Sequence, residues 1–416
     1  NSKILFNHFS IYQIKKNKFY SKYWGDLPNL IKEKNNVVWL NMTHSDFRNN
    51  KIKMINKFID HDKYSSNNQI HLFLESKINL KLIVKSFIDW LFLVFQYLRV
   101  HKYVTKIKFC NFYIWDIVEK DFFRSFLSSK AIFNVIYANL FEEAIKYIPA
   151  SCELFILYEG QGWETILISN WKKRSRSKVF LVSHDAKRYW DMRYQYSNKI
   201  FYANNHCPFP LADFYLYHGD YAYDNMATFI PKDKLLRSEA LRFNNIKSNK
   251  KNNLYKSNKR YKILILSSAN ISLNNDLLEI SSNFLKKYSK NYSFLFKAHP
   301  DTIIRNFNYS NITLLNPRDD LSLIINHADI VFTSASTSAA LDAYLSGINV
   351  ITLLDKSLPN ISPLYNFSNF KFCYDFKTFE EILLNLNQKN NNINNNTYSY
   401  FYTSKKLLLW KKLINY

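Results

Sequence analysis

The run YKILIL at residues 261–266 opens the part of the chain from which the fold can be predicted. A short apolar run without polar alternation is typical of a strand that is buried on both faces. Further apolar runs lie at 294–296, 312–315, 329–332 and 350–354, and segments with helical spacing lie at 276–288, 321–327, 338–346 and 379–386. This alternation predicts an α/β domain with a parallel sheet that helices cover on both faces.

The first half of the chain shows the same alternation. Strands are expected at 37–41, 154–158, 179–182 and 214–217, and helices at 80–98, 122–147, 164–173 and 220–229. The polar stretch 245–259 has no apolar period and is predicted to be a linker. We therefore expect one Rossmann-like lobe at 1–244, a second at 260–390, and an Asn-rich loop with a closing helix at 391–416. Ligands of open sheets bind beyond the carboxyl ends of the strands, so we expect the site in a cleft between the lobes.

Composition argues against several classes of protein. Only 5 of the 416 residues are glycine, and neither GxGxxG nor GxxxxGK[ST] occurs, which disfavours Rossmann dehydrogenases and P-loop ATPases. The four cysteines form no CxxC pair and HExxH is absent, so we expect a reducing compartment, no metal site and no cofactor. The most apolar stretch, 78–100, contains Lys81, Lys85 and Asp89, which argue against a membrane span. We interpret it as a core helix, and a helix on a membrane surface is the alternative interpretation.

A formal net charge of +24 makes nucleic acid, an anionic membrane surface and an anionic substrate candidate partners. The basic runs are short and scattered, and the aromatic signature of an RNA-binding module is absent, so we expect no nucleic-acid partner. The first residues lack the pattern of a signal peptide. We expect a cytoplasmic protein whose basic surface suits work at the inner face of the cytoplasmic membrane.

Two sets of side chains follow strands of the second lobe. His299 follows the strand at 294–296, and Pro300 restricts it to an extended backbone. A histidine in that position can contact a phosphate and stabilise a leaving group. Hydroxyl residues gather at 333–338, after the strand at 329–332, and four of them, Ser334, Ser336, Thr337 and Ser338, are candidate phosphate contacts. One hydroxyl would suffice to cap a helix, so four of them beside free N–H groups favour phosphate binding over simple capping.

The first lobe carries an acidic loop with glycines after the strand at 154–158. Glu159 is expected at the strand tip, where a carboxylate can act as general base toward a hydroxyl group. Gly160 permits close backbone approach, and Glu164, at the start of the next helix, is a candidate substrate contact. The alternative interpretation is a solvated loop whose carboxylates have no chemical role.

Charged and aromatic residues also gather at 183–194, after the next strand. The candidate substrate contacts there are His184, Asp185, Arg188 and Arg193. The two arginines can hold a carboxylate or a phosphate in bidentate fashion. Glu239 and Arg242, just before the linker, are expected to supply a charge pair at the junction of the lobes. A structural surface loop is the competing interpretation of 183–194.

The order of these landmarks resembles that of bacterial sialyltransferases and related transferases that use CMP-activated ulosonic acids. The longer motifs resemble a group of bacterial surface carbohydrate (O-antigen) biosynthesis proteins. These motifs are YEGQGWE at 158–164, SHDAKRYWDMRY at 183–194, EALRF at 239–243, KAHP at 297–300 and SASTSAALDAYLSGINVI at 334–351. The resemblance covers roughly residues 150–365.

What the resemblance implies is a GT-B glycosyltransferase without an obligatory metal, with the acceptor on the first lobe and the nucleotide sugar on the second. Glu159 would match the catalytic base, and His299 would match the histidine that contacts the CMP phosphate. Ser336 and Thr337, with Ser334 and Ser338 as neighbours, would match the hydroxyl pair on the same phosphate. This chain has one acidic residue before Gly160 rather than two, so Glu164 and Asp185 stay alternatives for the base.

The implied partners are a nucleotide-sugar donor, CMP-linked, and a glycan or lipid-linked glycan acceptor of a surface polysaccharide. Three other functions stay open at this point. The first is transfer of a polyol phosphate from CDP-glycerol, the second is epimerisation of a UDP-sugar at carbon 2, and the third is non-catalytic binding of nucleic acid.

Overall fold

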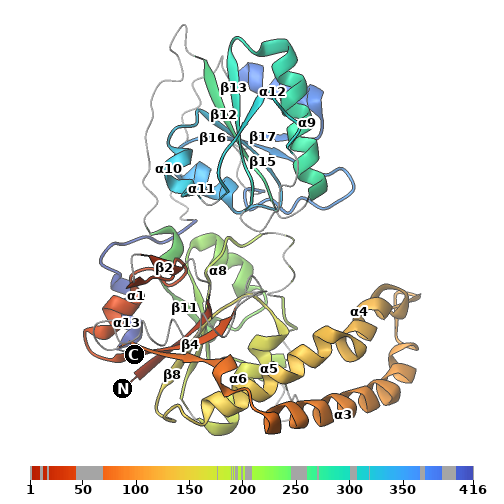
Figure 1. Ribbon diagram of the computed structural model, residues 1–416, viewed down its shortest axis with the longest axis vertical. Coiled ribbons are helices and arrows are strands. Elements are labelled where there is room, and N and C mark those ends of the chain that lie inside the picture. The colour runs from red at the N-terminus through yellow and green to blue at the C-terminus, as the bar shows by residue number, and fades with distance from the viewer. Residues whose placement is uncertain are drawn as a thin grey trace.

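The computed structural model describes residues 2–9, 13–15, 18–43, 69–175, 177–188, 190, 192, 195–197, 200–201, 209–244, 260–268, 271–299, 307–317, 319–365, 371–386 and 400–415. They form two lobes, each built on a parallel β-sheet, which lie one above the other in Figure 1. The predicted α/β class is confirmed. The expected linker at 245–259 and the Asn-rich stretch at 391–399 lie outside the described residues, and the domain boundaries stay a prediction.

The first lobe contains a seven-stranded sheet in which neighbouring strands are parallel. Across the sheet the strands are β11 (Leu235–Arg237), β10 (Phe214–Tyr217), β9 (Val179–Val182), β8 (Glu153–Leu157), β1 (Ser2–Phe9), β4 (Asn36–Thr43) and β5 (Gln69–Phe73). The four strands expected in this half are confirmed as β4, β8, β9 and β10. Strand β1 was not expected, because its apolar run Ile4–Phe6 is only three residues long before polar Asn7.

The second lobe contains a six-stranded sheet that is also parallel throughout. Its order is β14 (Ile312–Leu314), β13 (Tyr292–Lys297), β12 (Tyr261–Leu266), β15 (Ile330–Ser334), β16 (Asn349–Leu353) and β17 (Lys371–Cys373). The opening run YKILIL is therefore a central strand, buried on both faces as its composition predicts.

Helices cover both sheets on both faces. The helices of the first lobe are α1 (Leu27–Lys32), α3 (Leu80–Val104), α4 (Trp115–Leu127), α5 (Ser129–Ile145), α6 (Gly162–Arg174) and α8 (Asp220–Ala227), of which α3 and α4 project away from the sheet. The second lobe has α9 (Ile271–Tyr288), α10 (Leu321–Ile325), α11 (Ala339–Leu345) and α12 (Phe376–Leu386), and α13 (Leu408–Ile414) ends the chain. None of these described helices is both long enough and apolar enough to cross a membrane.

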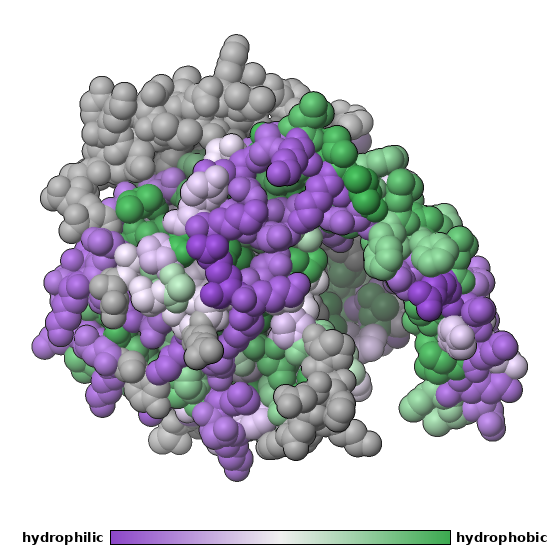
Figure 2. All heavy atoms as spheres, turned by 90° about the horizontal axis from the view of Figure 1, so that it is seen from below, coloured by the Kyte–Doolittle hydropathy of each residue, from purple (hydrophilic) through white to green (hydrophobic). Residues whose placement is uncertain are grey.

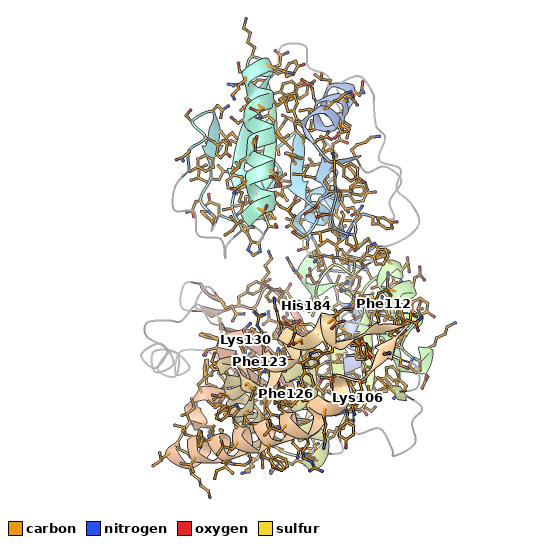
Figure 3. The ribbon with its side chains drawn as sticks, turned by 90° about the vertical axis from the view of Figure 1, so that its right-hand side faces the viewer. Lys106, Phe112, Phe123, Phe126, Lys130 and His184 are labelled. Atoms are coloured by element: carbon orange, nitrogen blue, oxygen red, sulfur yellow. The ribbon has the colours of Figure 1, made fainter. Side chains whose placement is uncertain are left out.

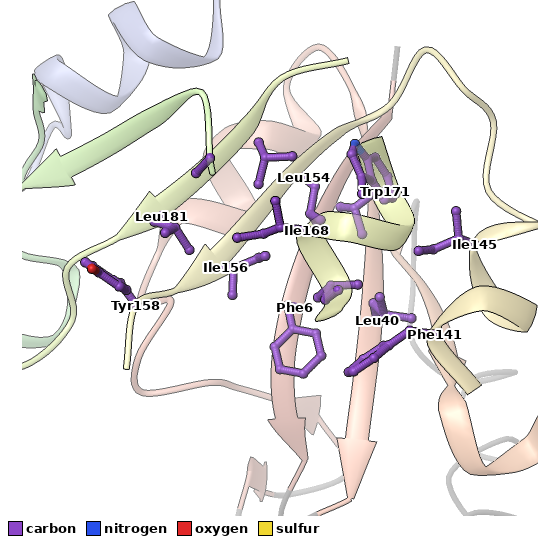
Figure 4. Close-up of a cluster of buried hydrophobic side chains, with 14 of the residues drawn as sticks. Phe6, Leu40, Phe141, Ile145, Leu154, Ile156, Tyr158, Ile168, Trp171 and Leu181 are labelled. Atoms are coloured by element: carbon purple, nitrogen blue, oxygen red, sulfur yellow. The ribbon is translucent and has the colours of Figure 1, made fainter. Parts of the chain in front are cut away.

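Alternate residues of each strand supply two separate cores. In the first lobe Phe6 shares one buried cluster with Phe141 of α5 and Trp171 of α6 (Figure 4), while the neighbouring Leu5 packs on the opposite face with α1 and α13. In the second lobe α9 and α12 cover one face, and α10 and α11 cover the other. This division follows from the two-residue period of a strand, which sends successive side chains to opposite faces.

The single helix expected at 122–147 is two helices in the structure. Ser128, with φ −89° and ψ 166°, ends α4 and begins α5. Its hydroxyl oxygen accepts the backbone N–H of Ala131 at 3.4 Å, which is the usual role of serine at a helix N-cap. The apolar spacing continues through the break, and therefore the sequence pattern conceals it.

The prediction that 78–100 forms a core helix is wrong. Helix α3 buries only Leu82 and Ser86. Together with α4 it forms an arm that projects from the first lobe, at the lower right of Figure 1. One apolar stripe of α3 packs against α4 and α5. A second apolar stripe on the same helix is covered by no described element.

The C-terminal helix returns to the first lobe. The indole of Trp410 is fully buried among Phe155, Leu5 and their neighbours, and its Nε1–H donates to the backbone oxygen of Glu239 at 3.0 Å. The carboxylate of Glu239 accepts the backbone N–H groups of Leu409 and Trp410 at 2.8 and 3.0 Å. A buried acid thereby satisfies the first turn of α13, where N–H groups have no partner within the helix.

We expect Trp410→Ala to lower the free energy of unfolding by about 3–5 kcal/mol, because it removes a large side chain from a close-packed core. Chemical denaturation followed by tryptophan fluorescence and circular dichroism measures the loss. Leu408→Ala, in the same helix but 54% exposed, is the control and should cost less than about 0.5 kcal/mol. Equal losses in the two variants would contradict the packing described for α13.

Candidate functional site at the junction of the two lobes

Three polar side chains meet at the carboxyl ends of three adjacent strands of the first sheet. Glu159 follows β8, His8 lies at the end of β1, and His184 follows β9. The carboxylate of Glu159 lies between the imidazoles: its Oε2 is 4.0 Å from His8 Nε2, and its Oε1 is 3.8 Å from His184 Nε2. The Glu159 side chain is 32% exposed, so its carboxylate combines contact with two imidazoles and access to solvent.

The loop that carries Glu159 is held by the side chain of Glu164. The Glu164 carboxylate accepts the backbone N–H groups of Glu159 (2.7 Å), Gly160 (3.3 Å) and Gln161 (3.3 Å). Gly160 has φ +69°, a conformation that favours glycine, and it turns the chain from β8 into α6. The glycine and Glu164 thus have local structural roles, and both fix the position of Glu159.

Burial raises the pKa of Glu164 to about 8, although the three N–H donors oppose that shift. The side chain lines a cavity of about 170 Å³ behind the loop, together with Gly160, Tyr196 and Tyr215. Polar and aromatic groups therefore surround a space that lies directly beside the turn from β8 into α6.

His184 lies on the side of the first lobe that faces the second lobe (Figure 3). Burial lowers its pKa to about 3, so the imidazole is neutral at physiological pH. The ring packs edge-on against Tyr23, with 5.4 Å between ring centres. A positively charged imidazolium beside Glu159 would make its carboxylate a weaker base, and a neutral imidazole does not.

Asp185 pairs with Arg242, whose Nη1 lies 3.2 Å from Asp185 Oδ1. Burial tends to raise the pKa of Asp185, but the charges of Arg242 and Arg188 and a hydrogen bond from the backbone N–H of Ala186 outweigh it, and the pKa is lowered. The predicted charge pair at the junction therefore exists for Arg242, with Asp185 as its partner rather than Glu239. The carboxylate of Glu239 is fully occupied in capping α13.

The second lobe presents its strand ends to the same junction. The backbone N–H of His299, two residues after β13, donates to Ser267 Oγ at 2.6 Å. Ser334 ends β15 and is buried, and neither its hydroxyl nor that of Ser336 has a hydrogen-bond partner among the described residues. Thr337 Oγ1 accepts the N–H of Ala339 at 3.3 Å and thus acts as the ordinary cap, while Ser338 makes no side-chain capping bond.

Buried polar groups without partners are rare in folded proteins. The hydroxyls of Ser334 and Ser336 are therefore buried donors without a described partner near the end of β15, and this feature distinguishes them from Thr337.

The lobes are packed together beside these groups. Ala186 and Tyr221 of the first lobe share one buried cluster with Ala340 and Leu341 of α11. Asp342 of α11 is close enough to Arg242 for the two charges to interact, and burial raises its pKa. The carboxyl ends of β8, β9, β13 and β15 therefore border one junction. No described cluster of His, Cys, Asp and Glu side chains has the arrangement of a metal site.

The predicted site residues fall into three groups. Glu159, His184, Asp185 and Arg242 lie together on the first-lobe side, and His299, Ser334 and Ser336 lie at strand ends of the second lobe. Glu164 and Glu239 hold backbone N–H groups, and Arg188 is close enough to Asp185 to influence its pKa. Arg193 lies outside the described residues.

Sequence reasoning missed His8. A signal was present in the sequence: the apolar run Ile-Leu-Phe at 4–6 is followed by the polar residues Asn7 and His8, which is the pattern expected at the end of a strand. Because the run at 4–6 is so short, no strand was predicted there, and the position of His8 at a strand end could not be recognised.

Comparison with known proteins informs the fold. No protein-family model and no curated protein sequence matches the chain. Among solved structures, the chain is similar to a putative UDP-N-acetylglucosamine 2-epimerase from Listeria monocytogenes, with a TM-score of 0.52 and 11% identity, over 93% of this chain and 88% of that one. The two lobes have the GT-B fold. The predicted fold type is thereby confirmed, and at this identity the likeness concerns the fold alone.

Two weaker likenesses have TM-scores below 0.5. One is to the glycotransferase of kitacinnamycin (TM-score 0.48, 7% identity, 93% of this chain and 90% of that one). The other is to a co-structure of Staphylococcus aureus MnaA with UDP (TM-score 0.47, 9% identity, 93% and 88%).

The raised pKa of Glu164 predicts a defined dependence of stability on pH. Between the ordinary value of 4.5 and about 8 the folded protein retains a proton that the unfolded chain releases. Stability should therefore fall across this window as pH rises, by at most about 1.4 kcal/mol per pH unit for one proton. Glu164→Gln should remove this part of the slope in urea unfolding measured at several pH values.

Glu381→Gln, at an exposed position of α12, is the matched control and should keep the slope of the unmodified protein. A Glu164→Gln variant whose stability depends on pH in the same way as the unmodified protein would contradict the protonated state of this carboxyl.

Proposed function

We propose that this protein is a metal-independent glycosyltransferase that moves a sugar from a nucleotide donor to a hydroxyl group of a glycan acceptor. The observation that carries the proposal is the position of the Glu159 carboxylate, at a strand end of one lobe and at the junction with the other. The GT-B fold supports this reading, because ligands of open parallel sheets bind beyond the carboxyl ends of the strands.

In the proposed reaction the second lobe holds the donor phosphate. The hydroxyls of Ser334 and Ser336 are buried donors that have no partner in the part of the chain that the structure describes, and a phosphate oxygen would satisfy them. His299 follows β13, and β12 lies between β13 and β15 in the sheet. The ring of His299 is our candidate for contact with the leaving phosphate. Thr337 and Ser338, which the resemblance also assigned to the phosphate, belong to the same turn.

In the first lobe Glu159 acts as the general base. Its carboxylate takes the proton of the acceptor hydroxyl as that oxygen forms a bond to the anomeric carbon. The bond from this carbon to the phosphate oxygen breaks, and the nucleotide leaves with the electron pair. A single displacement of this kind inverts the anomeric centre. His8 and His184 are positioning residues on either side of the carboxylate, and the neutral state of His184 keeps Glu159 basic.

The finer identity of the donor rests on sequence motifs. The resemblance to enzymes of CMP-activated ulosonic acids supports a CMP-linked donor whose sugar carries a carboxylate, which Arg188 and Arg193 would hold. The same resemblance supports an acceptor in surface polysaccharide or lipid-linked glycan synthesis. Within this proposal the enzyme acts in the cytoplasm, at the inner face of the membrane.

A second candidate is epimerisation of a UDP-sugar. The likeness to a putative UDP-N-acetylglucosamine 2-epimerase, with a TM-score of 0.52, supports it. The presence of one carboxylate and two imidazoles around one point supports it too, since such groups can remove and return a proton. Conversion of a UDP-sugar in the absence of any acceptor would favour this candidate over transfer. Turnover of CDP-glycerol would instead favour the polyol-phosphate transferase.

Removal of the base tests the proposal most directly. We expect Glu159→Gln to lower kcat for glycosyl transfer by about 10²- to 10⁴-fold, the usual contribution of general base catalysis. The KM for the donor should change little, because the donor phosphate is assigned to the other lobe. Glu33→Gln, an exposed substitution in the same lobe, should keep full activity. Unchanged transfer by Glu159→Gln would exclude Glu159 as the base.

Nucleotide binding can be tested without knowledge of the acceptor. In a thermal-shift panel of CMP, CDP, UDP, GDP and ADP we expect CMP or CDP to stabilise most, by about 2.7 kcal/mol at 100 times Kd. Ser334→Ala should weaken this nucleotide about 10- to 100-fold, since a hydrogen bond to a charged group is lost. The fold should tolerate the change, because the Ser334 hydroxyl has no described partner.

Ser322→Ala, at an exposed hydroxyl of α10, is the control and should bind like the unmodified protein. Absence of stabilisation by every nucleotide at millimolar concentration would contradict a nucleotide site, and equal affinity in Ser334→Ala would exclude this hydroxyl from it.

A further inference from the structure

The projecting part of the first lobe, residues 80–127, is a helical hairpin that we call the arm. An aromatic seam holds its two helices together: Tyr97 of α3 contacts Phe122 and Phe126 of α4, with 5.6 Å between ring centres in each pair. The indole Nε1–H of Trp90 donates to the backbone oxygen of Phe126 at 3.1 Å. Yet none of residues 87–130 is fully buried, so the arm has two helices and no enclosed core.

Helix α3 carries a second apolar surface, which we call the outer stripe. It consists of Val84, Phe87, Ile88, Leu91, Phe95 and Leu98, each between 48% and 63% exposed. These positions follow the i, i+3, i+4, i+7 pattern that places side chains on one face of a helix. Figure 2 shows hydrophobic residues along the arm, interspersed with hydrophilic ones. Monomeric soluble proteins rarely expose apolar surface in so continuous a form.

The free end of the arm has a distinct shape. Strands β6 (Lys108–Phe109) and β7 (Phe112–Tyr113) form a hairpin whose two turn residues, Cys110 and Asn111, have φ of 47° and 70°. Such a tight turn presents Phe109 and Phe112 side by side, and they are 71% and 75% exposed. We call this hairpin the tip. Two aromatic rings at the end of a rigid projection can enter an interface with little loss of conformational entropy.

The charge of the arm favours an anionic occupant. Between Trp90 and Trp115 the chain carries Arg99, Lys102, Lys106 and Lys108, and neither Asp nor Glu. Lys108 Nζ lies 4.5 Å from the centre of the Tyr113 ring, so a cation and the exposed aromatic residues share the tip. Figure 3 locates Phe112 and Lys106 on the same projecting part. These charges disfavour a protein partner, because the cores of protein interfaces are depleted of charged residues. They also disfavour a second copy of the chain, because two such arms would repel each other on contact.

We propose that the arm is a membrane-docking element that lies on an anionic lipid bilayer. The outer stripe occupies the boundary between headgroups and acyl chains, as an amphipathic interfacial helix does. Phe109 and Phe112 insert at the level that aromatic residues prefer, and Lys106 and Lys108 contact anionic headgroups. No described helix is suited to span the bilayer, so the association is peripheral.

Sedimentation of the full-length chain with lipid vesicles tests the proposal without any assay of activity. The probes are vesicles of phosphatidylcholine alone and vesicles of which about a third is phosphatidylglycerol, an amount that gives a strongly negative surface potential. We expect binding to the anionic vesicles that weakens as salt is added. The double variant Phe109→Ser, Phe112→Ser should bind at least about tenfold more weakly, since two exposed rings leave the interface.

Charge and apolar insertion are separated by a second pair of variants. Lys106→Gln with Lys108→Gln should lower affinity for anionic vesicles about fivefold per removed charge, with little effect on phosphatidylcholine vesicles. The matched controls lie in the second lobe: Leu323→Ser, at a leucine that is 66% exposed, and Lys286→Gln with Lys377→Gln. All controls should bind vesicles like the unmodified chain, and circular dichroism should show the same fold for every variant.

Three results would overturn the proposal. The first is absence of binding to anionic vesicles, and the second is tip variants that bind as tightly as the controls. The third is a stable dimer of the unmodified chain in solution that the tip variants convert to monomer, which would assign the arm to self-association. Because no readout depends on transfer, failure here leaves the proposed reaction intact, and failure of the reaction leaves the docking result intact.

Discussion

The parallel alignment of β1, β8 and β9 is the constraint on which the candidate site depends. Parallel strands end at the same edge of a sheet, so residues separated by some 150 positions in the chain reach one point without any direct link between them. His8, Glu159 and His184 meet only for this reason. The carboxylate of Glu164 completes the arrangement, because it holds the turn after β8 through three backbone N–H groups. Any change that shifts the register of β8 would move the Glu159 carboxylate away from the two imidazoles.

Much of the fold could be predicted because parallel sheets have a simple local signature. Strands β9 and β10 were expected with the residue bounds that the structure has, since each is a run of four apolar residues between polar neighbours. Strand β1 could not be recognised, because the burial that identifies it comes from its partners β4 and β8 rather than from its own composition. Helix α3 shows the converse error: its composition suggests a core, and its surroundings supply none.

The site was predictable to the same extent. Glu159 and the hydroxyls after β15 could be selected because they follow strands that are easy to recognise. The roles of Glu164 and Glu239 could not, since a carboxylate that holds backbone N–H groups and one that awaits a substrate look alike in sequence. Only contacts distinguish them, and for Glu239 the contacts are with a helix about 170 residues later in the chain. The unpartnered hydroxyls of Ser334 and Ser336 emerge for the same reason only in three dimensions.

The return of α13 to the first lobe has a consequence for how the protein is made. Trp410 belongs to the interior of a lobe whose sheet strands lie between residues 2 and 237, so that interior is completed only after residue 410 has been synthesised. The sheet of the second lobe lies between residues 261 and 373, all of which are synthesised before that point. A chain that stopped before α13 would leave exposed the apolar side chains of the first lobe that Trp410 covers.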